Sequence, residues 1–89
     1  MTDNTSRRVV ITGMGVVTPL GLDIPTTWEG VIAGKSGVDY ITLFDPEPLE
    51  TRFAGEVKGF EPTDYISRKQ ARHMDRFSQL AVAASLQAV

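Results

Sequence analysis

Two glycines near the N-terminus have the spacing that begins a phosphate-binding loop. Gly13 and Gly15 follow the apolar run 9–11, as the first two glycines of the dinucleotide fingerprint G-x-G-x-x-G follow a strand. The third glycine is replaced by Thr18, and because Pro19 comes next, no helix can start directly after Gly15. Such a helix would have to point its N-terminal amides at the pyrophosphate. The pattern therefore indicates a strand and an irregular turn rather than a nucleotide site.

The chain is poor in residues that do covalent or metal chemistry. It has no cysteine and one histidine, His73. Thiolate nucleophiles, disulfides and thiolate metal sites are thus excluded within these residues, and a pair of zinc-binding histidines cannot be formed. We expect no cofactor and no metal ion, and we assign His73 no catalytic role.

A cluster of positive charge lies in the last third. Arg68, Lys69, Arg72 and Arg76 are four of the nine Lys and Arg residues, within nine positions of a chain of net charge −2. On one continuous helix, Arg68, Arg72 and Arg76 share a face, with Lys69 and His73 beside them. This face is either simply solvated or binds an acidic partner. The acidic net charge and the absence of aromatic residues within the cluster argue against nucleic acid.

No targeting or membrane segment is indicated. Arg7 and Arg8 precede the apolar stretch as in a twin-arginine signal, but Gly13, Gly15 and Pro19 break that stretch and no cleavage site follows. No apolar run is long enough to cross a membrane. We expect a cytoplasmic protein whose residues 1–6 are a flexible N-terminus.

The first half of the chain predicts a strand and a helix. The run 9–11 is β-branched without alternation, as in a parallel strand covered on both faces. Thr26 and Glu29 have capping-box spacing and predict a helix that Gly34 ends. Trp28 is expected to anchor this helix in the core. Residues 35–48 are rich in turn formers, and residues 52–57 predict a short strand.

The last third is predicted to be helical. Ser67 and Gln70 form a second capping-box pair, and Asp75 either caps a new helix over 76–89 or lies within one that runs through. Apolar residues surround most of this second stretch, so it is expected to be buried on more than one side. The other elements of so short a chain cannot cover it. We therefore expect the N-terminal part of a larger α/β protein, ending inside a helix.

Four stretches in this order resemble the start of the β-ketoacyl-acyl-carrier-protein synthases, the elongating type II enzymes of fatty-acid synthesis. They are RRVVITGMGVVTPLG, TWEGVIAGKSGV, FAGEV and SRKQARHMDRFSQLAVAAS. The resemblance implies that residues 7–89 are the N-terminal part of a thiolase-like domain, which is five-layered and homodimeric when complete. It also implies that the glycine loop is the family's first passage from strand to loop, where no nucleotide binds.

The resemblance implies decarboxylative Claisen condensation of an acyl-enzyme with malonyl-acyl-carrier-protein. Family members use a cysteine, two histidines and a lysine that lie beyond residue 89. Such chemistry needs a thiolate of low pKa and donors aimed at the developing oxyanion. No catalytic residue is therefore expected among these 89, and the chain alone is expected to be inactive.

The resemblance also assigns the basic cluster. Positions matching Lys69, Arg72 and His73 help to dock the acidic acyl carrier protein in this family, and Arg68 is adjacent. His73 departs from the pattern, because a permanently charged residue is more usual there and histidine carries only part of a charge at neutral pH. Two alternatives stay open: a polyketide ketosynthase or its chain-length factor, and a non-catalytic module that binds a carrier protein.

Overall fold

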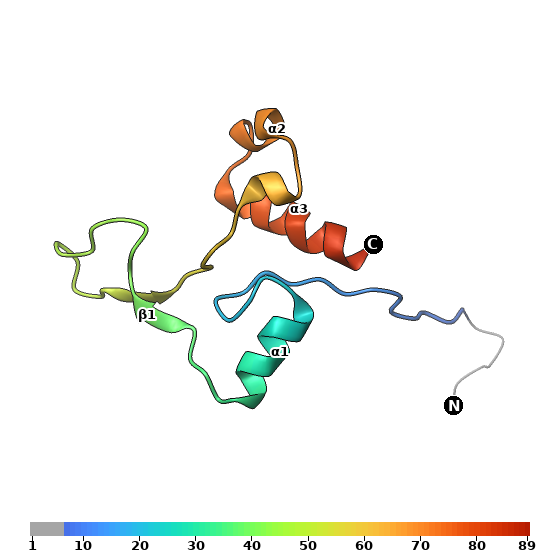
Figure 1. Ribbon diagram of the computed structural model, residues 1–89, viewed down its shortest axis with the longest axis horizontal. Helices are drawn as coiled ribbons and strands as arrows, with labels where there is room; N and C mark the ends of the chain where they lie inside the picture. Colours follow the sequence, from blue (N-terminus) through green and yellow to red (C-terminus); the bar gives the residue numbers. More distant parts are fainter. Residues whose placement is uncertain (1–6) are drawn as a thin grey trace.

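The computed structural model describes residues 7–89, so the flexible segment expected at 1–6 lies outside the described residues. Figure 1 shows an N-terminal arm (residues 7–22), a helix, a hairpin and a helical C-terminal part, joined by long connections. The elements in chain order are α1 (Ile24–Ile32), β1 (Val38–Tyr40), β2 (Phe53–Gly55), the 3-10 helix η1 (Pro62–Asp64), α2 (Arg68–Arg72) and α3 (Arg76–Ala88).

The chain is spread out for its length. Its radius of gyration is 17.4 Å, whereas a compact domain of this length has about 12 Å. Its exposed area is 7120 Å², against about 5,100 Å² for a folded monomer of this mass. Within residues 7–89, the buried hydrophobic side chains are those of Ile41 and Ala83. The elements are therefore positioned by local contacts and a few long-range ones rather than by a core.

The N-terminal arm is extended but is not a strand. Val9, Val10 and Ile11 are 88, 67 and 81% exposed, and no strand is assigned over 9–11. A strand needs a neighbouring backbone to take its hydrogen bonds, and none lies beside these residues in the described part of the chain. The predicted strand is therefore wrong for this structure, although the β-branched pattern that suggested it remains.

The glycines of the arm serve close packing. Glycine is often needed for backbone angles closed to other residues, but the positive φ angles among residues 7–89 are at Gly34 and Gly59, not at Gly13, Gly15 or Gly21. A Cβ at Gly13 would overlap the carbonyl oxygen of Ala88, and one at Gly15 that of Ala84. At Gly21 it would lie 2.7 Å from Thr26 Cγ2. The arm thus lies directly on the backbone of α3.

Helix α1 begins earlier than the capping-box pattern predicted. Asp23 is its N-cap, and Asp23 Oδ1 accepts a hydrogen bond from the Thr26 amide at 2.9 Å. Pro25 fits the first turn because that position needs no amide donor. Gly34 follows the C-cap at φ +71°, which confirms the predicted end. Trp28 is 60% exposed, so the prediction of a core anchor is wrong, since no layer of residues 7–89 faces it.

The two strands form an antiparallel hairpin. Val38 pairs with Gly55, Asp39 with Ala54 and Tyr40 with Phe53. Strand β2 confirms the strand expected within 52–57, whereas β1 lies in the stretch that its turn formers marked as irregular.

The helical C-terminal part confirms the second capping box. Ser67 Oγ accepts from the Gln70 amide at 3.1 Å, and Gln70 Oε1 accepts from the Ser67 amide at 3.3 Å. Helix α2 ends at Arg72, and α3 begins after Asp75, whose side chain makes no capping bond. Of the two arrangements considered, the new helix is therefore the observed one. No helix in residues 7–89 is long and apolar enough to span a membrane.

Candidate functional site

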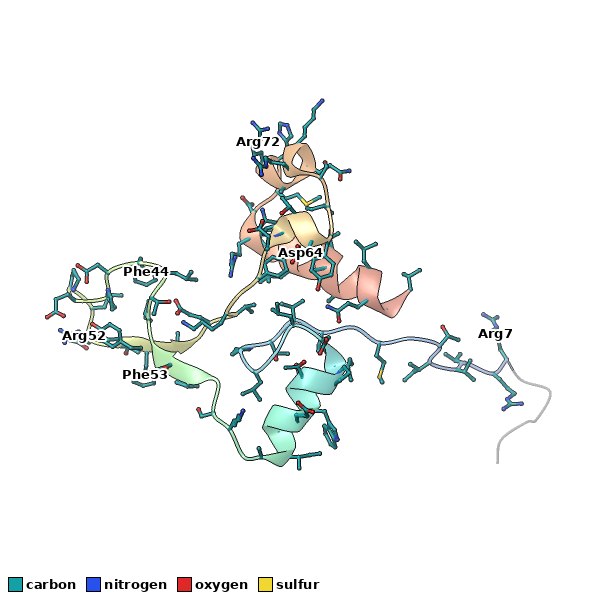
Figure 2. The ribbon with its side chains drawn as sticks, in the orientation of Figure 1. Arg7, Phe44, Arg52, Phe53, Asp64 and Arg72 are labelled. Atoms are coloured by element: carbon teal, nitrogen blue, oxygen red, sulfur yellow. The ribbon has the colours of Figure 1, made fainter. Side chains whose placement is uncertain are left out.

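The basic cluster predicted from the sequence lies on α2 and its C-cap. Arg68, Lys69 and Arg72 belong to the helix, His73 is the C-cap, and all four are exposed. Figure 2 shows Arg72 on α2, at the side of the molecule away from α1. Among the described residues, the ion pairs are Arg52–Glu47 and Lys58–Glu56, so these four side chains are not engaged in one.

Two spacings bring the charges together. Arg68 and Arg72 are four residues apart, Lys69 and Arg72 three, and Lys69 and His73 four, and side chains at these separations are neighbours on a helix. Since α2 has five residues, the cluster occupies little more than one turn. The result is a small positive surface that is open to solvent.

Arg76 does not belong to this surface. The chain turns between the two helices, so the single continuous helix on which Arg68, Arg72 and Arg76 would share a face is not formed. The guanidinium of Arg76 lies 5.5 Å from the centre of the Phe60 ring and donates to the Val57 carbonyl at 3.4 Å. Arg76 thus contributes to holding α3 against the 57–60 segment.

The carboxylate of Glu61 interacts with the positive charge of Arg68. The pKa of Glu61 is lowered, chiefly by hydrogen bonds from the Thr63 hydroxyl and amide, and also by the positive charge of Arg68. Glu61 caps η1, directly before α2 in the chain. The positive charge of Arg68 thus acts on a carboxylate of the same molecule, although the two groups form no ion pair.

The turn at the end of the glycine loop, residues 18–21, is held by hydrogen bonds within the turn. The Thr18 amide donates to the Gly21 carbonyl at 2.8 Å, and Thr18 Oγ1 accepts from the amides of Leu20 and Gly21 at 3.1 and 3.2 Å. These bonds engage the amides of the turn within the turn itself. The loop is thus an irregular turn, as its sequence indicated.

Apart from the basic cluster, residues 7–89 offer no further candidate binding or catalytic site. This part of the chain encloses no pocket and holds no group of three or more His, Cys, Asp or Glu side chains placed to bind a metal ion. Sequence reasoning did miss Glu56, which is 8% exposed and pairs with Lys58. Glu56 holds the loop at Thr42, 14 residues away, so no local pattern indicates it.

Comparison with known proteins identifies the fold. Residues 6–89 match the family model described as Beta-ketoacyl synthase, N-terminal domain. The chain belongs to this family. The ketosynthase segment is 50% identical over 84 residues to "3-oxoacyl-[acyl-carrier-protein] synthase 2" of Staphylococcus aureus (strain COL), covering 94% of this chain and 20% of that protein. A protein of the same name from Synechocystis is 44% identical over 89 residues, covering all of this chain and 21% of the relative.

A solved structure has the same arrangement of elements. "The ishigamide ketosynthase/chain length factor" superimposes with a TM-score of 0.85 at 42% identity, covering 93% of this chain and 21% of that one. The present segment thus has the N-terminal part of a thiolase-like ketosynthase fold. It spans about a fifth of the length of these relatives, which is consistent with its spread-out shape and its lack of a core.

Proposed function

We propose that this chain serves as the N-terminal fifth of an elongating β-ketoacyl-acyl-carrier-protein synthase of type II. The observation that carries the proposal is the 50% identity, over 94% of the chain, to a protein named 3-oxoacyl-[acyl-carrier-protein] synthase 2. The proposed reaction is condensation of an enzyme-bound acyl group with malonyl-acyl-carrier-protein, with loss of carbon dioxide, in a homodimeric and cytoplasmic enzyme.

The contribution of these residues to that reaction is not the chemistry itself. Condensation needs a thiolate to carry the acyl group and donors for the oxyanion and the enolate. The chain has no cysteine, and its one histidine, His73, is exposed at the end of α2. The nucleophile must therefore come from other residues of a complete synthase, and the present segment supplies structure and a docking surface.

The docking surface is the basic cluster on α2. Acyl carrier protein is acidic, and an exposed positive surface attracts such a partner during encounter and fixes its orientation. Lys69 and Arg72 are exposed and free of ion pairs within residues 7–89. We assign them the main contacts, with Arg68 and His73 as flanking contributors.

The test is charge reversal in a full-length synthase that carries this segment. Lys69→Glu combined with Arg72→Glu is expected to raise the KM for carrier-bound substrates about tenfold, equivalent to roughly 1.4 kcal/mol. Turnover of small thioesters without carrier protein is expected to stay unchanged. The matched control, Arg8→Glu with Lys35→Glu, changes the net charge equally at exposed sites outside α2. Equal losses with both substrate types, or with the control, would overturn the docking assignment.

A second candidate function rests on the structural neighbour. Because that structure is titled a ketosynthase/chain length factor and is 42% identical, the segment also fits a polyketide ketosynthase or its non-catalytic partner. Incubating the full-length protein with an acyl donor and measuring its mass separates a condensing enzyme, of fatty-acid or polyketide synthesis, from a chain-length factor. A covalent acyl-enzyme supports a condensing enzyme, whereas its absence supports the chain-length factor.

A further inference from the structure

The short basic helix α2 is held at both ends. At its N-terminus, Ser67 and Gln70 cap each other within the segment. At its C-terminus the support comes from α3, because Gln79 Nε2 donates to the Ala71 carbonyl at 3.0 Å and to the Met74 carbonyl at 3.5 Å. Isolated helices of five residues are not stable in water. The order of α2 therefore depends on bonds from outside the helix.

Gln79 reaches back across the turn that separates the two helices. The His73 amide bonds to Gln70 and the Met74 amide to Ala71, at 3.1 and 3.2 Å, which closes the last turn of α2. Asp75 then takes an extended conformation with φ −70° and ψ 161°. The Gln79 side chain is partly buried and spans this break. It is thus a direct polar link between α3 and the carbonyl end of α2.

Helix α3 is itself fixed by several contacts. Gly13 and Gly15 of the N-terminal arm lie against its backbone at Ala88 and Ala84, and Ala83 is fully buried. Arg76, in its first turn, is fixed on the Phe60 ring. A bond from α3 therefore ties the carbonyl end of α2 to several segments, in addition to the contact of α2 with η1, whereas the Ser67 cap orders α2 only internally.

We propose that Gln79 is a positioning residue for carrier-protein docking: its amide holds α2 so that Lys69 and Arg72 present their charges in a fixed direction. The inference rests on the proposed docking function of α2. Without the Gln79 donor, α2 samples more orientations, and binding must then order it. The free energy needed to order α2 is then taken from binding of the carrier protein. Gln79 contributes no charge of its own, so its effect on this binding is exerted through the orientation of α2.

The experiment uses a full-length synthase carrying this segment and the variant Gln79→Met, which keeps the length of the side chain and removes the donor. The KM for carrier-bound substrates is expected to rise about threefold to tenfold, in line with ordering of a few side chains. The kcat and KM for small thioesters are expected to stay within about twofold of wild type. Gln79→Glu, which keeps the shape and replaces the donor by an acceptor, is expected to raise the carrier KM at least as much.

Gln87→Met is the matched control. Gln87 is also an α3 amide, but it bonds to Val16, Leu22 and Tyr65 rather than to α2. Its replacement is expected to affect both substrate types alike. Equal losses with both substrates for Gln79→Met, an unchanged carrier KM, or a synthase that does not fold would overturn the Gln79 proposal. If charge reversal at Lys69 and Arg72 does not selectively raise the KM for carrier-bound substrates, the docking function itself is wrong. If charge reversal does so but Gln79→Met does not, only the positioning role of Gln79 is wrong.

Discussion

Lys58 Nζ lies 2.7 Å from Glu56 Oε1, directly after β2, where Glu56 also contacts the start of the loop that joins β1 to β2. The Glu56 carboxylate also accepts hydrogen bonds from the amide and hydroxyl of Thr42, at 3.0 and 2.9 Å, and from the Leu43 amide at 3.1 Å. One side chain thus gathers four donors from both sides of the loop. Because hydrogen bonds and a neighbouring ammonium favour the ionised form of a carboxyl group, the contacts of this loop are coupled to the charge state of Glu56.

The first prediction concerns the titration of Glu56. Lys58, followed by the Thr42 and Leu43 bonds, lowers the pKa of Glu56 from 4.5 to about 2 despite its desolvation. Since the folded pKa lies below the unfolded one, the stabilisation is fully present above pH 4.5 and is lost as the pH falls from 4.5 towards 2. A ¹³C NMR titration of glutamate carboxyls in the full-length synthase, assigned by loss of one signal in Glu56→Gln, measures it.

Lys58→Met is the companion variant, because it removes the largest cause of the shift. The pKa of Glu56 is expected to move up towards its ordinary value while the Thr42 and Leu43 bonds remain. The bonds from Lys58, Thr42 and Leu43 to the Glu56 carboxylate together form the Glu56 clamp. A wild-type Glu56 that titrates at its ordinary pKa would show that this clamp is not formed.

The second prediction concerns the contact between the arm and α3. A Cβ at Gly15 would meet the Ala84 carbonyl oxygen and lie 2.6 Å from Gln87 Cβ, so the arm must move away. Gly15→Ala is expected to destabilise a full-length synthase by about 3 kcal/mol, the upper end for overpacking, because backbone atoms cannot give way. Thermal unfolding measures this as a lowered Tm.

Gly34→Ala provides the comparison. Gly34 has φ +71°, but no atom lies within 4 Å of the point that a Cβ would occupy, so its substitution costs only the left-handed conformation, about 1–2 kcal/mol. A larger loss of Tm for Gly34→Ala than for Gly15→Ala would contradict the close approach of the arm to α3.

The features that the sequence predicted correctly are local. The Ser67–Gln70 capping box and the glycine that ends α1 depend on residues within a few positions of each other, and both are observed. The family could be identified because its motifs recur in order along the chain, and the family model confirms it. Short-range hydrogen bonds and the order of motifs can be predicted from the sequence because neither depends on which distant segments pack together.

The features that failed depend on distant partners. Trp28 and residues 9–11 have the apolar character of buried positions, yet no element among residues 7–89 covers them. The Glu56 clamp joins residues 14 positions apart, and the turn at 73–75 redirects Arg76 to Phe60. Of the candidate site, the sequence placed Arg68, Lys69, Arg72 and His73 together, and α2 keeps them so. Their proposed role in docking stays a prediction.

The third prediction concerns the 89-residue chain by itself. Large apolar side chains are exposed along most of its length, among them Val9 at 88%, Ile11 at 81% and Phe77 at 72%. Exposed apolar surface of this extent drives association. The purified chain is expected to self-associate and to bind a hydrophobic dye, as measured by light scattering and dye fluorescence. A monomer with dispersed amide resonances and one cooperative thermal transition would refute this.

The fourth prediction concerns activity of the same chain. Without a cysteine, it has no thiolate to accept an acyl group, and condensation of acyl- and malonyl-carrier-protein is expected not to exceed a control lacking protein. Product formation is followed by mass spectrometry of the carrier protein. A full-length relative assayed in parallel shows that the substrates are competent, and turnover by the 89-residue chain, in a preparation free of host synthase, would disprove the expectation.

The last prediction concerns His73, the member of the basic cluster that is not permanently charged. His73→Lys places a permanent positive charge at the C-cap of α2, where a cation is also favoured by the helix dipole. An exposed ion pair is worth roughly 0.2–1 kcal/mol, so the KM for carrier-bound substrates is expected to fall by up to about fivefold in a full-length synthase. His73→Gln, a neutral replacement, separates the effect of charge from that of the side chain. Because salt screens exposed charges, with a Debye length of about 8 Å at 0.15 M and 3 Å at 1 M, the advantage of His73→Lys is expected to vanish at high salt. The variant with Lys69→Glu and Arg72→Glu is expected to lose the least affinity as salt is added, since its attraction is already gone. A His73→Lys synthase whose carrier KM equals that of His73→Gln at low salt would show that the partner does not reach the end of α2.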